Sequence, residues 1–376
     1  MPRRAACSEW PTILNPAPGC YPLAAEMRAT ERTLHLALKT PQEPQAALER
    51  ALRSISSQYE QVDWCYAERQ PGGIEKAAQS AAARLNPTLV FLQIQRANTL
   101  PGAVIERLRA VCHPSCVIVQ WDGDMHHTPR DPGRQWFIDL GRACDCNLTV
   151  ETGYQKDYLA AGVRHPGYLE IGIDEQFYHP TEPTPGIPPV VLLAACYPDL
   201  EQIAPGGYAG RVRVAAECEK AYGIDGFGVY GSGWGPDPQR NYPGNVCRRE
   251  FLNQPQEAGV YAAAAAALSL SIRCDLPRYT SDRLFRMLAS GAVCLVENLP
   301  DYEGLGLVDG VNCLIFDEWD GLKSDLDEIL LTRNSPRWST MRQEAARLGL
   351  EHTWAARMPE LLACIDAVRA HREDRP

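Results

Sequence analysis

The chain has 376 residues, of which 45% are hydrophobic and 22% charged, and its formal net charge is −10. This length and composition predict a globular protein of two ordinary domains, and the acidic balance argues against a protein that mainly coats nucleic-acid phosphates. No apolar run approaches the ~20 residues of a membrane-spanning helix, and none follows the basic start Met1–Arg4, so we expect no transmembrane segment and a cytoplasmic location.

The 14 cysteines are spread from Cys7 to Cys364, mostly in apolar surroundings. Cys144 and Cys146 form the closest pair, but no second CxxC or His pair completes a zinc-binding pattern. We therefore expect reduced core thiols, no metal site and no cofactor.

In the first half, strand-like apolar runs alternate with amphipathic helical patterns. Residues 1–33, rich in proline and alanine, show no steady period and predict an N-terminal extension. The predicted strands cover 34–39, 62–67, 88–94, 116–121 and 147–150, and the predicted helices cover 46–57, 74–85, 104–111 and 134–143. This alternation favours a parallel sheet with helices on both faces.

A second alternating series follows residues 181–189, where five prolines or glycines in nine residues indicate a linker. Its predicted strands cover 190–195, 226–230, 268–272, 292–297 and 312–316, and its predicted helices cover 210–222, 256–267, a short stretch within 278–291, 321–331, 337–348 and 354–372. We predict an α/β protein with two doubly wound domains, 34–180 and 190–350, whose ligands bind at the carboxyl ends of strands.

The segment 278–297 reads as a polar loop, a short helix and a buried strand. Thr280 or Ser281 can cap the helix, and Gly291 suits its C′ position. The free N–H groups at the helix start are flanked by Arg273, Arg278 and Arg283. This arrangement favours a phosphate or diphosphate, although an ordinary surface helix has the same pattern.

The same segment resembles the signature region of group 1 glycosyltransferases, nearest to the branch related to spore-coat maturation glycosyltransferases. The resemblance is clear over 190–356 and looser over 88–180. It is carried by Arg278–Glu297, Leu299–Gly304, Val308–Asp317, His352–Trp354, the glycine-rich strand end Gly228–Trp234 and, in the first half, Ile171–Pro180.

The resemblance implies a GT-B architecture, in which two Rossmann-like domains face each other across a cleft. The second domain would hold a UDP-, GDP- or dTDP-linked sugar, and the first would hold a hydroxyl-bearing acceptor. The last helix, within 351–376, would cross back to the first domain. The transfer would need no metal, because helix N–H groups and basic side chains neutralise the leaving diphosphate.

The expected donor-binding residues are Gly231, Ser232, Gly233, Arg278, Tyr279, Thr280, Ser281, Arg283 and Glu303. The sequence departs from the family pattern in one respect. Many relatives have a ribose-binding glutamate where this chain has Arg286, and Arg278 occupies the position of the upstream glutamate. Glu303 or Asp301 is then the candidate for the ribose.

Candidate catalytic bases follow the predicted strand 116–121. Asp122, Asp124 or His126 can take a proton from an acceptor hydroxyl, because carboxylates and imidazole both work near neutral pH. The alternative is that Asp122 caps the loop and the histidines are exposed. Trp136, Tyr154, Trp234 and Tyr242 are candidates for stacking on a sugar or base, or for the core.

Two other functions remain open. The missing glutamate also fits a nucleotide-sugar binder that transfers nothing, or an epimerase-like protein. A hydroxymethylated DNA base, as in phage systems, is an alternative acceptor, although the net charge of −10 counts against stable nucleic-acid binding.

Overall fold

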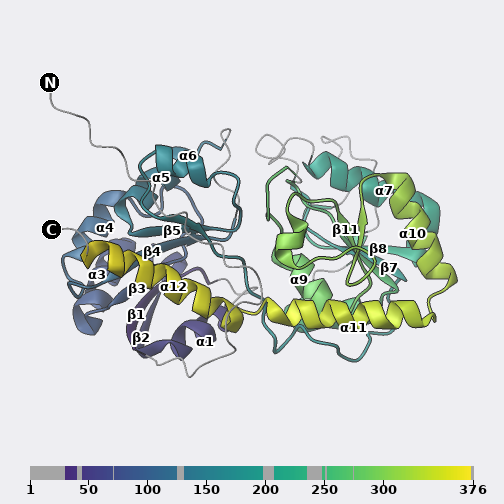
Figure 1. The fold of residues 1–376 in the computed structure, drawn as a ribbon, viewed down its shortest axis with the longest axis horizontal. Coiled ribbons are helices and arrows are strands. Elements are labelled where there is room, and N and C mark those ends of the chain that lie inside the picture. Colours follow the sequence, from purple (N-terminus) through teal and green to yellow (C-terminus); the bar gives the residue numbers. More distant parts are fainter. Residues whose placement is uncertain are drawn as a thin grey trace.

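A computed structural model describes residues 30–39, 45–70, 72–124, 131–197, 207–234, 248–249, 252–273 and 275–373. Its strands form two six-stranded sheets, and every pair of neighbouring strands is parallel. Each sheet lies in its own lobe (Figure 1). The α/β class and the two Rossmann-like domains are as the sequence predicted.

The amino-terminal lobe has the strand order β2-β1-β3-β4-β5-β6. Its strands are β1 (Glu31–Ala37), β2 (Ser56–Asp63), β3 (Leu89–Leu92), β4 (Val117–Asp122), β5 (Cys146–Thr149) and β6 (Pro166–Tyr168). Its helices are α1 (Ala46–Ser54), α2 (Trp64–Ala67), α3 (Gly73–Leu85), α4 (Gly102–Arg109), α5 (Arg134–Ala143) and α6 (Gln155–Ala160). Apolar clusters cover both faces of this sheet, and β3 and β4 are buried throughout.

The carboxyl-terminal lobe has the order β12-β11-β10-β7-β8-β9. Its strands are β7 (Val190–Leu193), β8 (Phe227–Tyr230), β9 (Arg248–Arg249), β10 (Ala266–Ser269), β11 (Cys294–Glu297) and β12 (Leu314–Phe316). Its helices are α7 (Gly207–Gly226), α8 (Gln254–Ala263), α9 (Asp282–Ala289), η2 (Tyr302–Leu305), α10 (Trp319–Leu331) and α11 (Pro336–Glu351). The strand order reverses between β7 and β10, and open α/β sheets bind ligands at such a point.

The last helix, α12 (Trp354–Glu373), returns from the second lobe and lies along the first, beside α1 and β4 (Figure 1). Arg369 forms a two-pronged ion pair with Glu31, with both N–O distances 2.8 Å. Arg372 donates to the carbonyl of Cys116 and pairs with Asp145. The two ends of the described chain are therefore joined within one lobe.

Several elements differ from the prediction. β1 begins at Glu31, three residues earlier than expected, and β2 ends at Asp63, whose side chain caps the short helix α2. α8 ends at Ala263, and β10 already begins at Ala266, so the alanine run 262–267 is divided between helix and strand. The short elements α6, β6 and β9 were not predicted.

The cysteines in the described ranges are ten free thiols, seven of them buried. Burial raises the pKa of the Cys144, Cys218 and Cys313 thiols. They pack in the apolar clusters of both lobes, as expected for core cysteines.

Candidate functional site

A pocket lies where the strand order of the second sheet reverses. Its floor is formed by the carboxyl ends of β7 and β8, and its walls come from α8 and the first turn of α9. The residues that line it are Leu193, Ala194, Ala195, Tyr230, Gly231, Ser232, Leu252, Glu257, Tyr261, Asp282, Arg283 and Arg286. The structure thus brings together Gly231, Ser232 and Arg283 of the predicted donor-binding residues.

Two arginines meet behind this pocket. Arg211, in the first turns of α7, is only 6% exposed and donates to the carbonyl oxygens of Ala195 (2.5 Å) and Leu270 (2.7 Å). Burial and the neighbouring Arg283 guanidinium lower the pKa of Arg211 to about 10. In the described part of the chain, Nε of Arg211 and Nη1 of Arg283 are buried without hydrogen-bond partners. Two unneutralised cations with unpaired donors are suited to an anion.

Sequence reasoning missed Arg211. The only signal was an arginine in the predicted helix that follows the first strand of the second domain, at the expected ligand-binding edge. Gly207 explains how α7 comes so close to β10, since a Cβ atom there would lie 2.1 Å from the carbonyl oxygen of Ile272. This close approach carries Arg211 to the ends of β7 and β10.

The glycines after β8 have a structural explanation within the chain itself. Gly231 and Gly233 have φ angles of 135° and 81°. A Cβ atom would lie 2.3 Å from the carbonyl oxygen of Ala194 at the first position and 1.8 Å from that of Cys196 at the second. Both glycines are therefore required for the β8 loop to pack on the β7 loop. Ser232, between them, lines the pocket.

Ser281 stands at the N-cap of α9, but its side chain makes no capping hydrogen bond. Gly291 follows the helix with a φ of 70°, the left-handed conformation that its C′ position predicts. Thr280 and Tyr279 are buried, and Tyr279 packs in the core cluster of the amino-terminal lobe. The start of α9 is thus next to the pocket and to the lobe boundary.

Arg278 and Glu303 do not line the pocket. Arg278 pairs with Asp301 through Nε (2.6 Å), and its guanidinium lies over the Tyr168 ring of the other lobe, 5.6 Å from the centroid. Glu303 is exposed in η2. Glu303 and Asp301, the two predicted ribose candidates, are therefore not among the residues that line the pocket.

Carboxylates nevertheless reach the pocket near Arg286. Nη1 of Arg286 lies 3.1 Å from Oε2 of Glu257 on α8, and its other terminal nitrogen pairs with Asp282 one turn earlier on α9. Tyr178 donates to the same Glu257 oxygen at 2.5 Å. Glu257 was not among the predicted site residues, because only the fold brings α8 beside α9.

The predicted catalytic loop follows β4. Asp122 is fully buried and accepts a hydrogen bond from the Asp124 backbone N–H (3.0 Å), so it shapes the turn. Asp124 is exposed, and His126 lies outside the described residues. Burial, and next the Asp124 carboxylate, raise the pKa of Tyr279. Asp124 also contributes to the raised pKa of Tyr208, after burial. Arg211 affects both tyrosines, so Asp124 lies near the arginine pair.

The lobes contact each other through the segment before α9. Arg273 donates to the Tyr154 hydroxyl (3.1 Å), and the N–H of Thr152 donates to the carbonyl of Pro277 (3.2 Å). Leu276 packs in the same amino-terminal cluster as Tyr279. Of the stacking candidates, Trp234 is buried in the second lobe and Trp136 is half-buried, while Tyr242 lies outside the described residues.

Within the described ranges, no group of three or more His, Cys, Asp or Glu side chains is placed to hold a metal ion. No helix among those residues is long and apolar enough to cross a membrane.

Comparison with known proteins supports the fold and the domain type. Residues 211–363 match the family model described as "Glycosyl transferase-like". No curated protein matches the sequence.

Three solved structures resemble the chain. *Anabaena* HepE in complex with UDP-glucose has a TM-score of 0.57 at 12% identity, and the match covers 89% of this chain and 100% of that one. A glycosyltransferase from *Rickettsia africae* has a TM-score of 0.58 at 10% identity, covering 89% and 98%. Sucrose-phosphate synthase from *Thermosynechococcus elongatus* has a TM-score of 0.51 at 14% identity, covering 79% and 77%.

The chain therefore has the GT-B fold and carries a glycosyltransferase-like domain that includes Arg211, Glu257 and Arg283. This agrees with the family resemblance of the sequence motifs. The family model has a general description, and the match does not distinguish the spore-coat-maturation branch from other glycosyltransferases.

Proposed function

We propose that the chain is a glycosyltransferase that moves a sugar from a nucleotide-sugar donor, held in the second lobe, to a hydroxyl acceptor held by the first. The observation that carries this proposal is the pair Arg211 and Arg283 at the strand-order reversal. Their unpaired donors, Nε and Nη1, lie beside a pocket next to the start of α9. A diphosphate supplies the missing negative charge and hydrogen-bond acceptors.

The same groups would assist the chemistry. When the sugar leaves, negative charge grows on the oxygen of the departing diphosphate. Arg283, Arg211 and the N–H groups at the start of α9 would stabilise that charge, since they are fixed by the fold before the reaction begins. We propose on this basis that the transfer proceeds without a metal ion.

The acceptor would approach from the amino-terminal lobe. Asp124 lies on the loop after β4, is exposed, and influences Tyr208 and Tyr279 beside the arginine pair. We assign it the role of general base for the acceptor hydroxyl. Asp122 would hold the loop through its hydrogen bond to the Asp124 N–H. His126 is a further candidate base from the sequence alone.

The donor is most simply a UDP-sugar, because HepE, which shares the fold, was solved with UDP-glucose. GDP- and dTDP-sugars are the other candidates. We also propose that the chain belongs to the spore-coat-maturation branch and is located in the cytoplasm. We propose that its two domains cover 34–180 and 190–350, joined by the linker 181–189.

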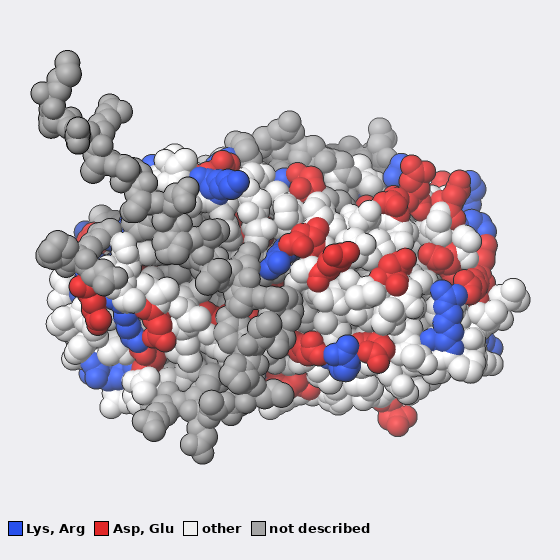
Figure 2. Space-filling view, viewed as in Figure 1, with Lys and Arg blue, Asp and Glu red and all other residues white. Residues whose placement is uncertain are grey.

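A nucleic-acid acceptor has less support. On the face shown in Figure 2, the described lysines and arginines are interspersed with acidic residues and do not form a broad basic area. Together with the net charge of −10, this favours a glycan, a protein or a small hydroxylated molecule as acceptor.

The test is turnover of a panel of UDP-, GDP- and dTDP-linked sugars, with release of the nucleoside diphosphate as readout. At least one donor is expected to release its diphosphate in the presence of a hydroxyl acceptor, and Arg283→Ala is expected to lower the rate at least tenfold. Arg347→Ala, an exposed arginine on α11, is the matched control. Tight donor binding without turnover on any acceptor would instead identify a non-transferring nucleotide-sugar binder.

A further inference from the structure

Helix α8 presents two polar groups to the pocket that the diphosphate site does not use. Glu257 and Tyr261 are four residues apart, so they lie on the same face of the helix, and both line the pocket. The first turn of α8 is fixed by a reciprocal cap between Asn253 and Gln256. The N–H of Glu257 also donates to the Asn253 carbonyl (3.0 Å). The fold of the ligand-free protein therefore fixes the positions of Glu257 and Tyr261 on α8.

Both groups have unused hydrogen-bonding capacity in the described part of the chain. Tyr261 is completely buried, and its hydroxyl has no hydrogen-bond partner there. The two hydrogen bonds to Glu257, from Tyr178 and Arg286, both reach Oε2, which leaves Oε1 without one. Burying a hydroxyl without a partner is costly, so such a group in a pocket indicates a ligand that completes it.

Glu257 and Tyr261 lie near Arg283, one of the two arginines of the proposed diphosphate site. Burial raises the pKa of Tyr261, and the charged groups that influence it further are Glu257, Arg283, Arg286 and Asp282. Arg283 also influences Tyr279, together with Asp124 and Arg211. Arg283 therefore lines the pocket together with Glu257 and Tyr261 and also influences Tyr279 at the lobe boundary.

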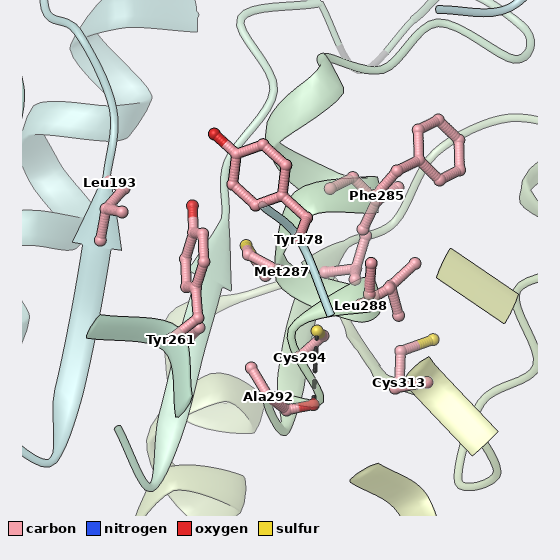
Figure 3. Packing of buried hydrophobic residues seen from close by; sticks show 14 of the residues in the cluster. Tyr178, Leu193, Tyr261, Phe285, Met287, Leu288, Ala292, Cys294 and Cys313 are labelled. Carbon is pink, nitrogen blue, oxygen red and sulfur yellow. Dashed lines mark hydrogen bonds between the residues drawn. The ribbon is translucent and has the colours of Figure 1, made fainter. Parts of the chain in front are cut away.

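In Figure 3, the Tyr261 ring lies between Leu193 of β7 and the Tyr178 ring. The hydroxyls of both tyrosines point away from Ala292 and Cys294 in the buried cluster. The Tyr261 ring is therefore packed in the core, and its hydroxyl points away from the Ala292 and Cys294 side of the cluster.

We infer that Glu257 and Tyr261 form the subsite for the vicinal hydroxyls of the donor ribose. This inference rests on the proposed function. If the diphosphate lies at Arg283 and the sugar lies toward Asp124, the nucleoside extends toward α8. A carboxylate accepts hydrogen bonds from two adjacent hydroxyls, and a tyrosine hydroxyl can donate or accept. The ion pair with Arg286 holds the Glu257 side chain in place.

The experiment compares the binding of UDP with 2′-deoxy-UDP, and of GDP with 2′-deoxy-GDP, by calorimetry. Pyrophosphate serves as a probe of the arginine pair alone. Wild type is expected to prefer at least one ribonucleotide over its deoxy form by about tenfold or more, as for hydrogen bonds to charged groups. Tyr261→Phe keeps the buried ring and is expected to weaken ribonucleotide binding about fivefold without changing pyrophosphate affinity. Glu257→Gln is expected to bring the ribose preference close to one.

Tyr222→Phe is the matched control, because the Tyr222 hydroxyl donates to Asp327 on α10 and Tyr222 does not line the pocket. A ribose preference that is absent in wild type, or that persists in both variants, overturns the inference while the diphosphate site stands. An equal loss of pyrophosphate binding in Tyr261→Phe also overturns it. If wild type binds no nucleoside diphosphate at all, the proposed function fails first.

Discussion

Arg211 and Arg283 are like-charged neighbours, and in the described ranges neither forms an ion pair. Burial and the Arg283 charge both disfavour the charged form of Arg211, whose pKa falls to about 10. A protein that only needed stability would not gain from this arrangement. The unfavourable pair is what a binding site for a strongly anionic group requires.

Arg283→Ala is therefore expected to stabilise the ligand-free protein. The substitution removes a like charge and a buried unpaired donor, so the melting temperature should rise by about 1–3 °C. Differential scanning calorimetry without added anions measures this. Arg347→Ala, on an exposed surface, should change the melting temperature by less. A fall of several degrees in Arg283→Ala would contradict the idea that the pair is held under electrostatic strain.

Arg283 could be predicted from sequence and Arg211 could not, for a physical reason. Arg283 lies in a local pattern of loop, helix and glycine stop, which favours an anion site although an ordinary surface helix has the same pattern. The role of Arg211 depends on the burial of an arginine between the ends of β7 and β10, which are separated by about 70 residues of chain. No local pattern contains that information.

Gly233→Ala is expected to destabilise the second lobe severely. The new Cβ would overlap the carbonyl oxygen of Cys196, 1.8 Å away, in addition to the cost of the positive φ of 81°. Gly310→Ala is a matched control, because Gly310 has a similar φ of 74° but nothing within 4 Å of its Cβ position. The control should lose about 1–2 kcal/mol and Gly233→Ala at least twice that. If urea unfolding shows equal losses of unfolding free energy in the two variants, the close packing of Gly233 on Cys196 does not contribute to stability.

The same loop shows what a motif can and cannot predict. Gly231, Ser232 and Gly233 were predicted to bind the donor, and the contact that the structure shows for the two glycines is close packing on the β7 loop of the chain itself. Similarly, the alternation of strands and helices predicted the fold class, whereas the end of α8 was placed too late because alanine strongly favours helix, and packing in the sheet overrides this preference at Ala266 and Ala267. Glu257 was missed because it reaches Arg286 only through packing of α8 beside α9.

Glu170 should make stability depend on pH. It is 1% exposed, and burial raises its pKa from 4.5 to about 7, although the nearby Arg357 opposes the shift. Because the folded pKa lies above the unfolded one, the stabilising contribution is complete below pH 4.5 and is lost as pH rises to about 7. Glu170→Gln should remove about 3 kcal/mol of this loss between pH 4.5 and 8.

Unfolding free energies of wild type and Glu170→Gln across this pH range test the point. Glu344→Gln, on the exposed side of α11, is the control and should follow wild type. Parallel pH curves for wild type and Glu170→Gln would contradict a raised pKa at Glu170.

Arg369→Ala is expected to loosen α12 from the first lobe. Burial raises the pKa of Glu31, but the hydrogen bonds from Arg369 and Thr88 more than offset this, so the net pKa is lowered. Without Arg369, the buried Glu31 carboxylate loses its two-pronged partner, at a cost of about 3 kcal/mol. Faster amide hydrogen exchange across 354–373 measures the effect. Arg347→Ala, whose pairs are exposed, should cost less than about 1 kcal/mol and leave that exchange unchanged.

The most direct test of the account is the affinity of nucleoside diphosphates for wild type and Arg283→Ala, measured by calorimetry with UDP, GDP, dTDP and the matching nucleosides. We predict that wild type binds at least one diphosphate at least tenfold more tightly than its nucleoside. In Arg283→Ala this advantage should largely disappear while nucleoside affinity is kept. Equal diphosphate affinity in the two proteins would show that the arginine pair is not the donor-diphosphate site.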